Sequence, residues 1–245
     1  MPAGGFFKIV DTVDSTNNYA MEKVHAGLAN HGMAWFANDQ TAGKGQRGKA
    51  WKTEKGSNII MSIVLQPGRF NSQQQFLLSA AVALAVFDLF SKYAGDETKI
   101  KWPNDLYWRD RKAGGVLIEN VFHGKTWKWA VVGIGMNINQ VVFDDSLQNP
   151  VSLRQVTGKA FDAIALAKEL YDLLMKNSSA LNKGADKDLL EEYNRNLYRL
   201  NRQVTLKKGG SNFTTAIKGV SAEGRLMTSG DPEQQFDFGE VEWVL

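Results

Sequence analysis

The stretch TAGKGQRGKAW, residues 41–51 and here called the glycine loop, has the composition of a phosphate-binding loop. Gly43, Gly45 and Gly48 match the dinucleotide fingerprint G-x-G-x-x-G, and the same letters match a Walker A loop as far as its lysine. Both motifs need a helix directly after the glycines, but this sequence continues into another apolar run without helical periodicity. Ala50 also stands where a Walker A loop needs a hydroxyl for magnesium. The glycine loop therefore belongs to neither motif.

The cations of the glycine loop allow two interpretations. Lys44, Arg47 and Lys49 lie among glycines that let a backbone approach an anion closely, which favours a mobile flap that grips phosphate. The alternative is a flexible hairpin loop in which the glycines form the turn and the cations are solvated.

A second polar cluster lies in residues 99–120, KIKWPNDLYWRDRKAGGVLIEN. Pro103 is expected to break a strand so that Asn104 and Asp105 project from its end, and Lys112 lies just before two glycines. Amide, carboxylate and ammonium groups at a strand end are suited to magnesium and polyphosphate. Alternatively, this is a charged surface turn whose tryptophan covers the core.

A third cluster is VVGIGMNIN, residues 131–139. Gly133 and Gly135 in a buried strand either leave space for a close approach by another group or mark a bulge. Asn137 and Asn139 follow as polar groups on one face of the strand.

Apolar periodicity predicts the elements that must position these clusters. Short apolar runs and one hairpin with its turn at 123–125 predict strands at residues 6–10, 33–38, 57–67, 98–102 and 114–139. Helical spacing predicts helices at residues 14–30, about 72–93, 162–181 and 187–200. Beyond residue 200, short strands separated by glycine-rich turns are typical of a small antiparallel barrel. We therefore expect two domains, residues 1–200 and 201–245.

The composition of the 245-residue chain narrows the classes of protein. It contains no cysteine, which excludes disulfides, thiolate metal sites and cysteine nucleophiles, and makes a cytoplasmic location the expectation. The three histidines lack a paired ligand spacing, so no zinc site is expected. No signal peptide is predicted, and the apolar run 76–90 is short for a membrane span and carries Asp88, so it is interpreted as a core helix. A net charge of +3 is too weak to indicate nucleic-acid binding by itself.

In this order and spacing, the clusters resemble the catalytic module of biotin protein ligases. The segments that carry the resemblance are Ser15–Asn17, Gln40–Trp51, Lys101–Glu119 and Gly133–Asn139. With the C-terminal strands, the likeness covers nearly the whole chain. It implies an α+β fold: a mixed β-sheet with flanking helices, like class II synthetases, plus a small C-terminal SH3-like β-barrel. The N-terminal DNA-binding arm of many bacterial members is expected to be absent, so the resemblance implies an enzyme and no DNA partner.

The resemblance also implies the site residues. Ser15, Thr16, Asn17 and Gln40 would line the pocket for the biotin ring, and Lys112 would contact the biotin carboxylate. The full biotin-binding set adds the residues Gly43, Gly45, Gln46, Arg47, Gly114 and Gly115. The set for ATP or the adenylate comprises Lys44, Arg47, Lys49, Trp51, Asn104 and Asn137. In the family the glycine loop is usually richer in arginine than it is here, where Lys44 and Gln46 stand at arginine positions and cannot grip an anion in bidentate fashion.

The implied activity is ATP-dependent biotinylation of a lysine on a biotin carboxyl carrier protein or domain of an acyl-CoA carboxylase, through biotinyl-5′-AMP. The catalytic residues would be Lys112, Arg47 and Asp105, with ATP, Mg²⁺ and biotin bound. Asp105 either binds magnesium or orients and deprotonates the attacking lysine. No membrane partner is expected, and a homodimer is left open because some members dimerise through the central sheet.

Several alternatives are left open by the sequence. A lipoate or octanoate protein ligase would share the architecture, although its usual arginine-rich and triple-glycine signature is absent. A non-enzymatic nucleic-acid-binding protein would use the basic clusters and the small barrel. Ser15 and Thr16 also suit a helix N-cap, and Trp51 and Trp102 suit packing of the core or lid as well as stacking on a ligand.

Overall fold

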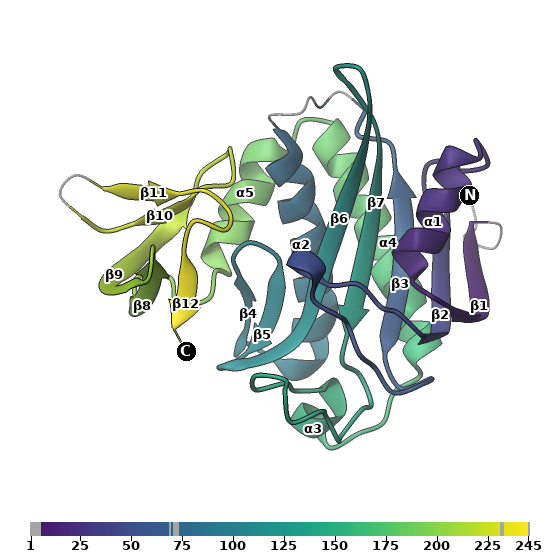
Figure 1. Ribbon diagram of the computed structural model, residues 1–245, viewed down its shortest axis with the longest axis horizontal. Helices are drawn as coiled ribbons and strands as arrows, with labels where there is room; N and C mark the ends of the chain where they lie inside the picture. The colour runs from purple at the N-terminus through teal and green to yellow at the C-terminus, as the bar shows by residue number, and fades with distance from the viewer. Residues whose placement is uncertain (1–5, 69, 71–73, 231–232, 245) are drawn as a thin grey trace.

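The computed structural model describes residues 6–68, 70, 74–230 and 233–244. In this part of the chain a seven-stranded sheet lies beside a smaller five-stranded sheet, with helices between and around them (Figure 1). The α+β fold class with a mixed sheet and a small second sheet is confirmed.

The large sheet has the strand order β1-β2-β3-β7-β6-β5-β4. The pair β1–β2 is parallel and the other neighbours are antiparallel, so the sheet is mixed. Its strands are β1 (Phe7–Val13), β2 (Ala34–Gln40), β3 (Ile59–Leu65), β4 (Thr98–Lys101), β5 (Asp105–Trp108), β6 (Arg111–His123) and β7 (Thr126–Met136). Because β3 and β7 lie at the centre, they bury apolar side chains on both faces, as the sequence predicted for β3.

The helices cover the two faces of the large sheet unequally. Helix α1 (Thr16–His25) packs with Trp35, Val64 and Val131 on one face. Helices α2 (Gln75–Ala94) and α4 (Ala163–Asn182) pack on the other, which carries the main core. Because side chains alternate along a strand, residues 133 and 135 of β7 lie on the same face as Val131, which is the face that α1 covers. That face is the one which the glycine loop crosses.

Helix α2 corresponds to the helix predicted at about residues 72–93 and ends at Ala94. It spans 20 residues, and by length and composition it is the one helix among the described residues that could cross a membrane. In the fold it packs against α4 and α5 (Asp186–Arg195) and buries most of its apolar side chains there. It is therefore a core helix, as predicted. The expected start of this helix near residue 72 lies outside the described residues.

The small sheet has the strand order β11-β10-β9-β8-β12 and is antiparallel throughout. Its strands are β8 (Gln203–Lys208), β9 (Ser211–Val220), β10 (Leu226–Thr228), β11 (Gln234–Phe236) and β12 (Glu242–Val244). A second apolar cluster joins it to α2, α5 and β4. Within this cluster Trp102 Nε1 donates a hydrogen bond to Gly224 O at 2.9 Å, and Tyr193 Oη donates to Pro103 O at 2.9 Å. The loop between β9 and β10 and helix α5 therefore hold the turn that follows β4.

Several local features differ from the sequence expectations. Helix α1 ends at His25 and not near residue 30, and β1 continues to Val13 and does not end at residue 10. Helix α5 ends at Arg195 and not near residue 200, because the next residues run along β4, where Tyr198 N donates to Ile100 O at 2.8 Å. The short strand β5 and the short helix α3 (Leu153–Thr157) were not predicted. Both are too short to carry a periodic signal, and both are fixed by tertiary contacts.

Candidate active site

The glycine loop is a closed hairpin with a single 3-10 turn at Gln46–Gly48 and no α-helix after it. Gly45 N donates to Lys49 O at 2.6 Å, and Trp51 N donates to Gly43 O at 2.8 Å. Arg47, at the tip, has a left-handed backbone with φ of 53°. The rejection of both helix-linked phosphate motifs is thus confirmed, and strain at the tip is the kind that functional loops carry.

A buried polar cluster joins the start of α1 to the sheet. Gln40 Oε1 accepts from Thr16 N at 2.7 Å and from Thr16 Oγ1 at 3.1 Å. Ser62 Oγ lies 2.6 Å from Asn17 Oδ1 and 2.8 Å from Thr16 Oγ1, so its single proton serves one of them at a time. Asn17 Nδ2 donates to Glu119 Oε2 at 2.8 Å. The structure brings these predicted pocket residues together and adds Ser62 and Glu119, which sequence reasoning missed.

Ser15 lies directly before this cluster and is 1% exposed. It occupies the N-cap position of α1, but its side chain makes no capping hydrogen bond. The helix-cap alternative is therefore confirmed for the position of Ser15, although no side-chain hydrogen bond supports it. Its burial next to the polar cluster is compatible with a role in a pocket.

Gly133 and Gly135 mark two close approaches on the α1 face of β7. A Cβ on Gly133 would overlap the Asn17 amide, and a Cβ on Gly135 would overlap the Trp51 indole. These glycines are paired in regular register with β3 and β6, so the bulge alternative is wrong. The indole Nε1 of Trp51 is buried and has no hydrogen-bond partner among the described residues. Such an orphaned donor suits an acceptor on a bound ligand.

Lys112 and Asp105 form an ion pair on the same face, with Nζ and Oδ1 2.7 Å apart. Both side chains are about one-third exposed or less, at 33% and 27%. Gly115 lies beneath this pair, since a Cβ there would lie 3.2 Å from Asp105 Oδ1. Gly114 faces Gly135 O across β6 and β7, where a Cβ would approach to 2.9 Å. Gly115 thus leaves room where the charged pair meets the sheet, whereas a Cβ on Gly114 would approach Met136 of the main core.

Asn104 and Asn137 have structural partners. Asn104 Nδ2 donates to Val116 O, which fixes the turn between β4 and β5 against β6. Asn137 is 5% exposed, and its Nδ2 donates to Val151 O at 3.2 Å and to Lys112 O at 3.4 Å. Asn137 therefore positions the backbone of Lys112, while its predicted contact to an adenylate stays a prediction.

Lys101 is a third charged residue of the site and was not predicted as such. It is 8% exposed, and Nζ donates to Tyr107 Oη at 3.1 Å. Burial lowers the pKa of Lys101 to about 8, although the Asp105 carboxylate opposes this shift. The sequence feature that could have identified Lys101 as a site residue is its position directly before W-P-N-D.

The lowered pKa of Lys101 predicts a pH-dependent stability. Because the unfolded chain holds this proton more tightly, the folded protein is penalised below pH 8 and regains stability as the pH rises from about 8 to 10.5. This pKa shift corresponds to a free-energy cost of roughly 3 kcal/mol for keeping Lys101 charged in the folded protein. We expect Lys101→Met to raise the free energy of unfolding at pH 7 by about 1–2 kcal/mol after loss of its hydrogen bond. Urea unfolding at pH 7 and pH 10.5 measures this, and a gain as large at pH 10.5 would contradict it.

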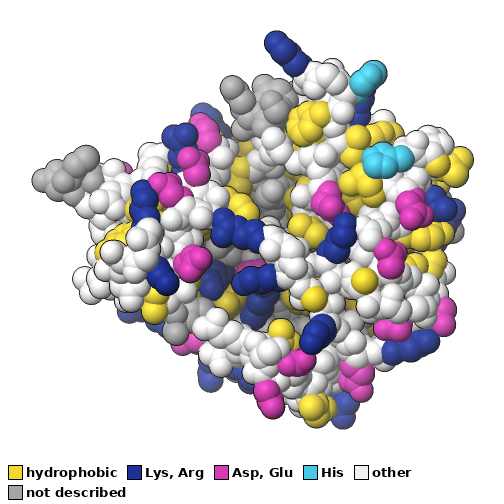
Figure 2. Space-filling model, in the orientation of Figure 1, with side chains coloured by type: hydrophobic (Ala, Val, Ile, Leu, Met, Phe, Trp, Pro, Cys, Tyr) yellow, Lys and Arg dark blue, Asp and Glu magenta, His cyan; other side chains and the backbone are white. Residues whose placement is uncertain are grey.

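Cations outnumber anions around the site. Lys44, Arg47 and Lys49 of the glycine loop join Lys101 and Lys112, and Lys44 pairs with Glu119 at 3.7 Å. Figure 2 shows Lys and Arg side chains gathered around the middle of this side of the molecule. An excess of positive charge over buried polar groups is suited to a ligand that carries both phosphate and carboxylate groups.

The residues present fit magnesium as a partner of phosphate. Among the described residues no group of three or more His, Asp or Glu side chains is arranged to hold a metal ion. Asp105 is the one carboxylate among the predicted site residues, and it is ion-paired with Lys112. Magnesium commonly binds through one or two carboxylates and substrate phosphates, so Asp105 alone would suffice as a protein ligand.

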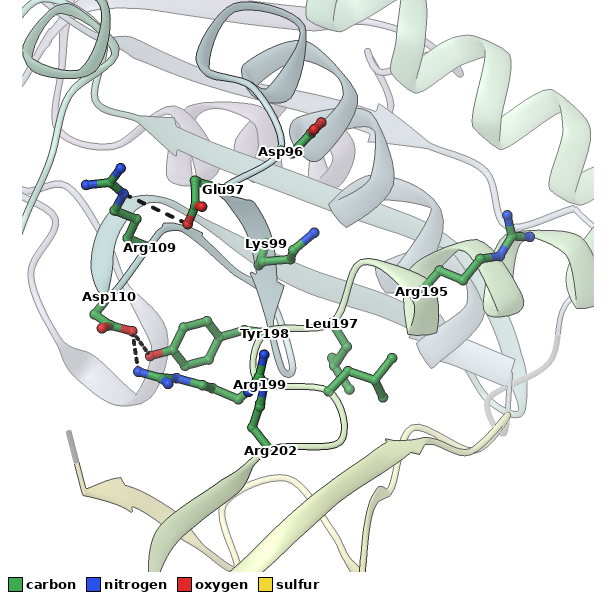
Figure 3. A pocket seen from close by; sticks show the side chains of 11 residues that line it. Asp96, Glu97, Lys99, Arg109, Asp110, Arg195, Leu197, Tyr198, Arg199 and Arg202 are labelled. Atoms are coloured by element: carbon green, nitrogen blue, oxygen red, sulfur yellow. Dashed lines mark hydrogen bonds and ion pairs between the residues drawn. The ribbon is translucent and has the colours of Figure 1, made fainter.

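A separate cleft of about 760 Å³ lies at the opposite end of the β4–β5 hairpin (Figure 3). Tyr198 and Arg199 line it, and both contact Asp110 Oδ1, at 2.6 Å and 2.7 Å. None of the predicted site residues lines this cleft. A large hollow is the default place to look for a ligand, but here the convergent buried polar groups lie on the α1 face instead.

The fold is that of biotin protein ligases. The structure matches the biotin protein ligase from Aquifex aeolicus in complex with biotin and ATP with a TM-score of 0.82 at 23% identity, covering 97% of this chain and 98% of that one. It matches the enzyme from Leishmania major in complex with biotinyl-5-AMP with a TM-score of 0.66 at 20% identity, over 97% and 100% of the two chains.

The sequence defines the family. The sequence model of the Biotin/lipoate A/B protein ligase family matches residues 9–137, more than half of the chain, and the chain belongs to this family. It is 29% identical over 234 residues to the bifunctional ligase/repressor BirA of Escherichia coli, covering 93% of this chain and 70% of that protein. It is 29% identical over 231 residues to the biotin--[acetyl-CoA-carboxylase] ligase of Paracoccus denitrificans, covering 91% and 93%.

Proposed function

We propose that the chain is a biotin protein ligase, which uses ATP to attach biotin to a lysine of a carrier protein. The observation that carries this proposal is the placement of the glycine loop, the Lys112–Asp105 pair and the polar cluster of α1 on one face of one sheet. The family, and two relatives named as biotin--[acetyl-CoA-carboxylase] ligases that each cover 91% of this chain, support it.

The polar cluster suits the ring end of biotin. The ureido group of biotin offers one carbonyl acceptor and two N–H donors, and Thr16, Asn17, Gln40 and Ser62 together offer both donors and acceptors. Thr16, Asn17 and Ser62 are buried and Gln40 is half-buried. Because these groups are already fixed by one another, they would select a ligand by hydrogen bonding at little cost in ordering.

The charged pair suits the other end of the vitamin. A carboxylate cannot acylate an amine at neutral pH because its oxygen is a poor leaving group, so AMP must first be transferred to it with release of pyrophosphate. Lys112 would hold the carboxylate in line with the α-phosphorus, and Arg47 and Lys49 would stabilise charge on the phosphate oxygens. Magnesium, held by the phosphates and Asp105, would neutralise the triphosphate when bound.

The second step is attack of an acceptor lysine on the mixed anhydride. The attacking amine must be uncharged, and the C–N bond forms as AMP leaves. Asp105 would orient this amine or take its proton. The glycine loop would exclude water from the anhydride until the acceptor arrives.

Isotope exchange between ATP and pyrophosphate tests the first step without an acceptor. We expect exchange that depends on biotin, and a parallel reaction with lipoate in place of biotin that gives none. Exchange with lipoate alone would make the lipoate or octanoate ligase the correct alternative. Retention on DNA in moderate salt without any exchange would support a nucleic-acid-binding protein.

The acceptor that we propose is the biotin carboxyl carrier domain of an acyl-CoA carboxylase. Two relatives are named as biotin--[acetyl-CoA-carboxylase] ligases, which supports this choice. A cytoplasmic location is part of the same proposal, because the cysteine-free chain suits a reduced compartment. Incubation with a purified carrier domain, ATP and biotin, followed by intact-mass measurement, tests the acceptor through the mass of one biotinyl group.

A further inference from the structure

The tip of the glycine loop contacts the small sheet. The Arg47 guanidinium lies over the Phe238 ring, with Cζ 4.9 Å from the ring centroid. Phe238 belongs to residues 237–240, here called the β11–β12 turn, and is 50% exposed. Arg47 makes no ion pair with any described residue. Among the described residues, its positive charge therefore interacts with the Phe238 ring through this cation–π contact.

The next residue of the turn, Gly239, leaves space for this contact because it has no side chain. Gly239 has φ of 89°, and a Cβ there would overlap the guanidinium of Arg47. A side chain at this position would push Arg47 away from Phe238. The absence of a side chain at residue 239 thus lets the guanidinium lie against the turn.

The same aromatic ring contacts the second half of the site. Trp102 packs edge-on against Phe238, with ring centroids 6.1 Å apart, and directly precedes the turn of Pro103 and Asn104. Phe238 therefore lies between the tip of the glycine loop and the turn that leads to Asp105. The glycine loop is held on the large sheet as well, through Lys44 and Glu119.

We propose that Phe238 and Gly239 are positioning residues, which hold Arg47 and so keep the glycine loop closed between the two sheets. This inference rests on the proposed function, because it assigns the small sheet the task of retaining the adenylate. An exposed cation–π pair is weak, so its loss should shift the loop between closed and open forms by about 2- to 5-fold. A shift of this size in the closed-to-open equilibrium suits a lid that must open for each acceptor.

The first test is hydrogen exchange of the glycine-loop amides in the free protein, which does not depend on the function. In Phe238→Ala and Gly239→Ala, the glycine-loop amides should exchange about 2- to 5-fold faster than in the wild-type protein. In Phe238→Tyr, the amides should exchange as slowly as in the wild-type protein. Gly210→Ala is the matched control, since Gly210 has φ of 88° in the same sheet with nothing within 4 Å of a Cβ. Equal exchange in Gly239→Ala and Gly210→Ala would overturn the inference.

The second test measures escape of biotinyl-AMP into solution in the absence of acceptor, with pyrophosphatase present. Escape should be about 2- to 5-fold faster in Phe238→Ala and Gly239→Ala, and Phe238→Ala should add nothing in an Arg47→Gln background. If the wild-type protein forms no adenylate, the proposed function is wrong. If it forms adenylate and these variants retain it as Gly210→Ala does, this inference fails alone.

Discussion

Lys112→Ala is expected to lower biotin-dependent ATP–pyrophosphate exchange by about 10²–10³-fold, the usual cost of removing one stabilising group from a transition state. The lysine ammonium lies 2.7 Å from Asp105 and is placed by backbone hydrogen bonds to Asn149 and Val151. In the proposed mechanism it holds the carboxylate that attacks phosphorus. Without it, neither the charge nor the in-line geometry is maintained.

The fold should survive this substitution. Lys112 is one-third exposed and its pair with Asp105 is partly solvated, so it contributes about 0–1 kcal/mol to stability. Lys92→Ala is the matched control, because Lys92 forms a similar pair with Glu169, at 2.6 Å, between α2 and α4 and away from the site. We expect Lys92→Ala to retain exchange. Near-normal exchange by Lys112→Ala in a folded protein would show that its assigned role is wrong.

Gly133→Ala is expected to weaken biotin binding by about 10- to 100-fold, since the added Cβ would overlap the Asn17 amide. Asn17 is 2% exposed and cannot move into solvent. It would have to leave Ser62 or Glu119, and a buried polar group that loses its partner costs about 1–3 kcal/mol. Calorimetric titration with biotin measures the change in affinity.

A double-mutant cycle isolates the steric cause of this effect. Asn17→Ala removes the amide that the new methyl group would meet. In that background, Gly133→Ala should have little further effect on biotin affinity, because the two changes act on one contact. Additive losses from the two substitutions would show that Gly133 acts elsewhere, for example through the general stability of β7.

The sequence determined the long elements and the chemistry of the residues that they carry. The continuous apolar run of β3, buried on both faces, and the long apolar run of α2 are local properties of the chain, so both elements were predictable. The glycine loop was recognised as a non-helical loop because its following residues lack helical spacing. The clusters at residues 101–105, 112 and 133–137 each allowed a structural alternative when taken alone, and their order and spacing, which resemble those of biotin protein ligases, gave them a functional interpretation.

The tertiary structure decided which of these groups meet. Ser62 looks like any polar residue in an apolar run, but the register of β3 with β7 places it opposite Gly133, beneath the start of α1. Glu119 reaches Asn17 and Lys44 because β6 lies beside β7. Arg47 and Phe238 are 191 positions apart in the sequence (238 − 47), and their contact depends on the small sheet packing against α2, α5 and β4. Periodicity reports burial of a residue in its own element, whereas contacts between distant segments arise only when the sheets assemble.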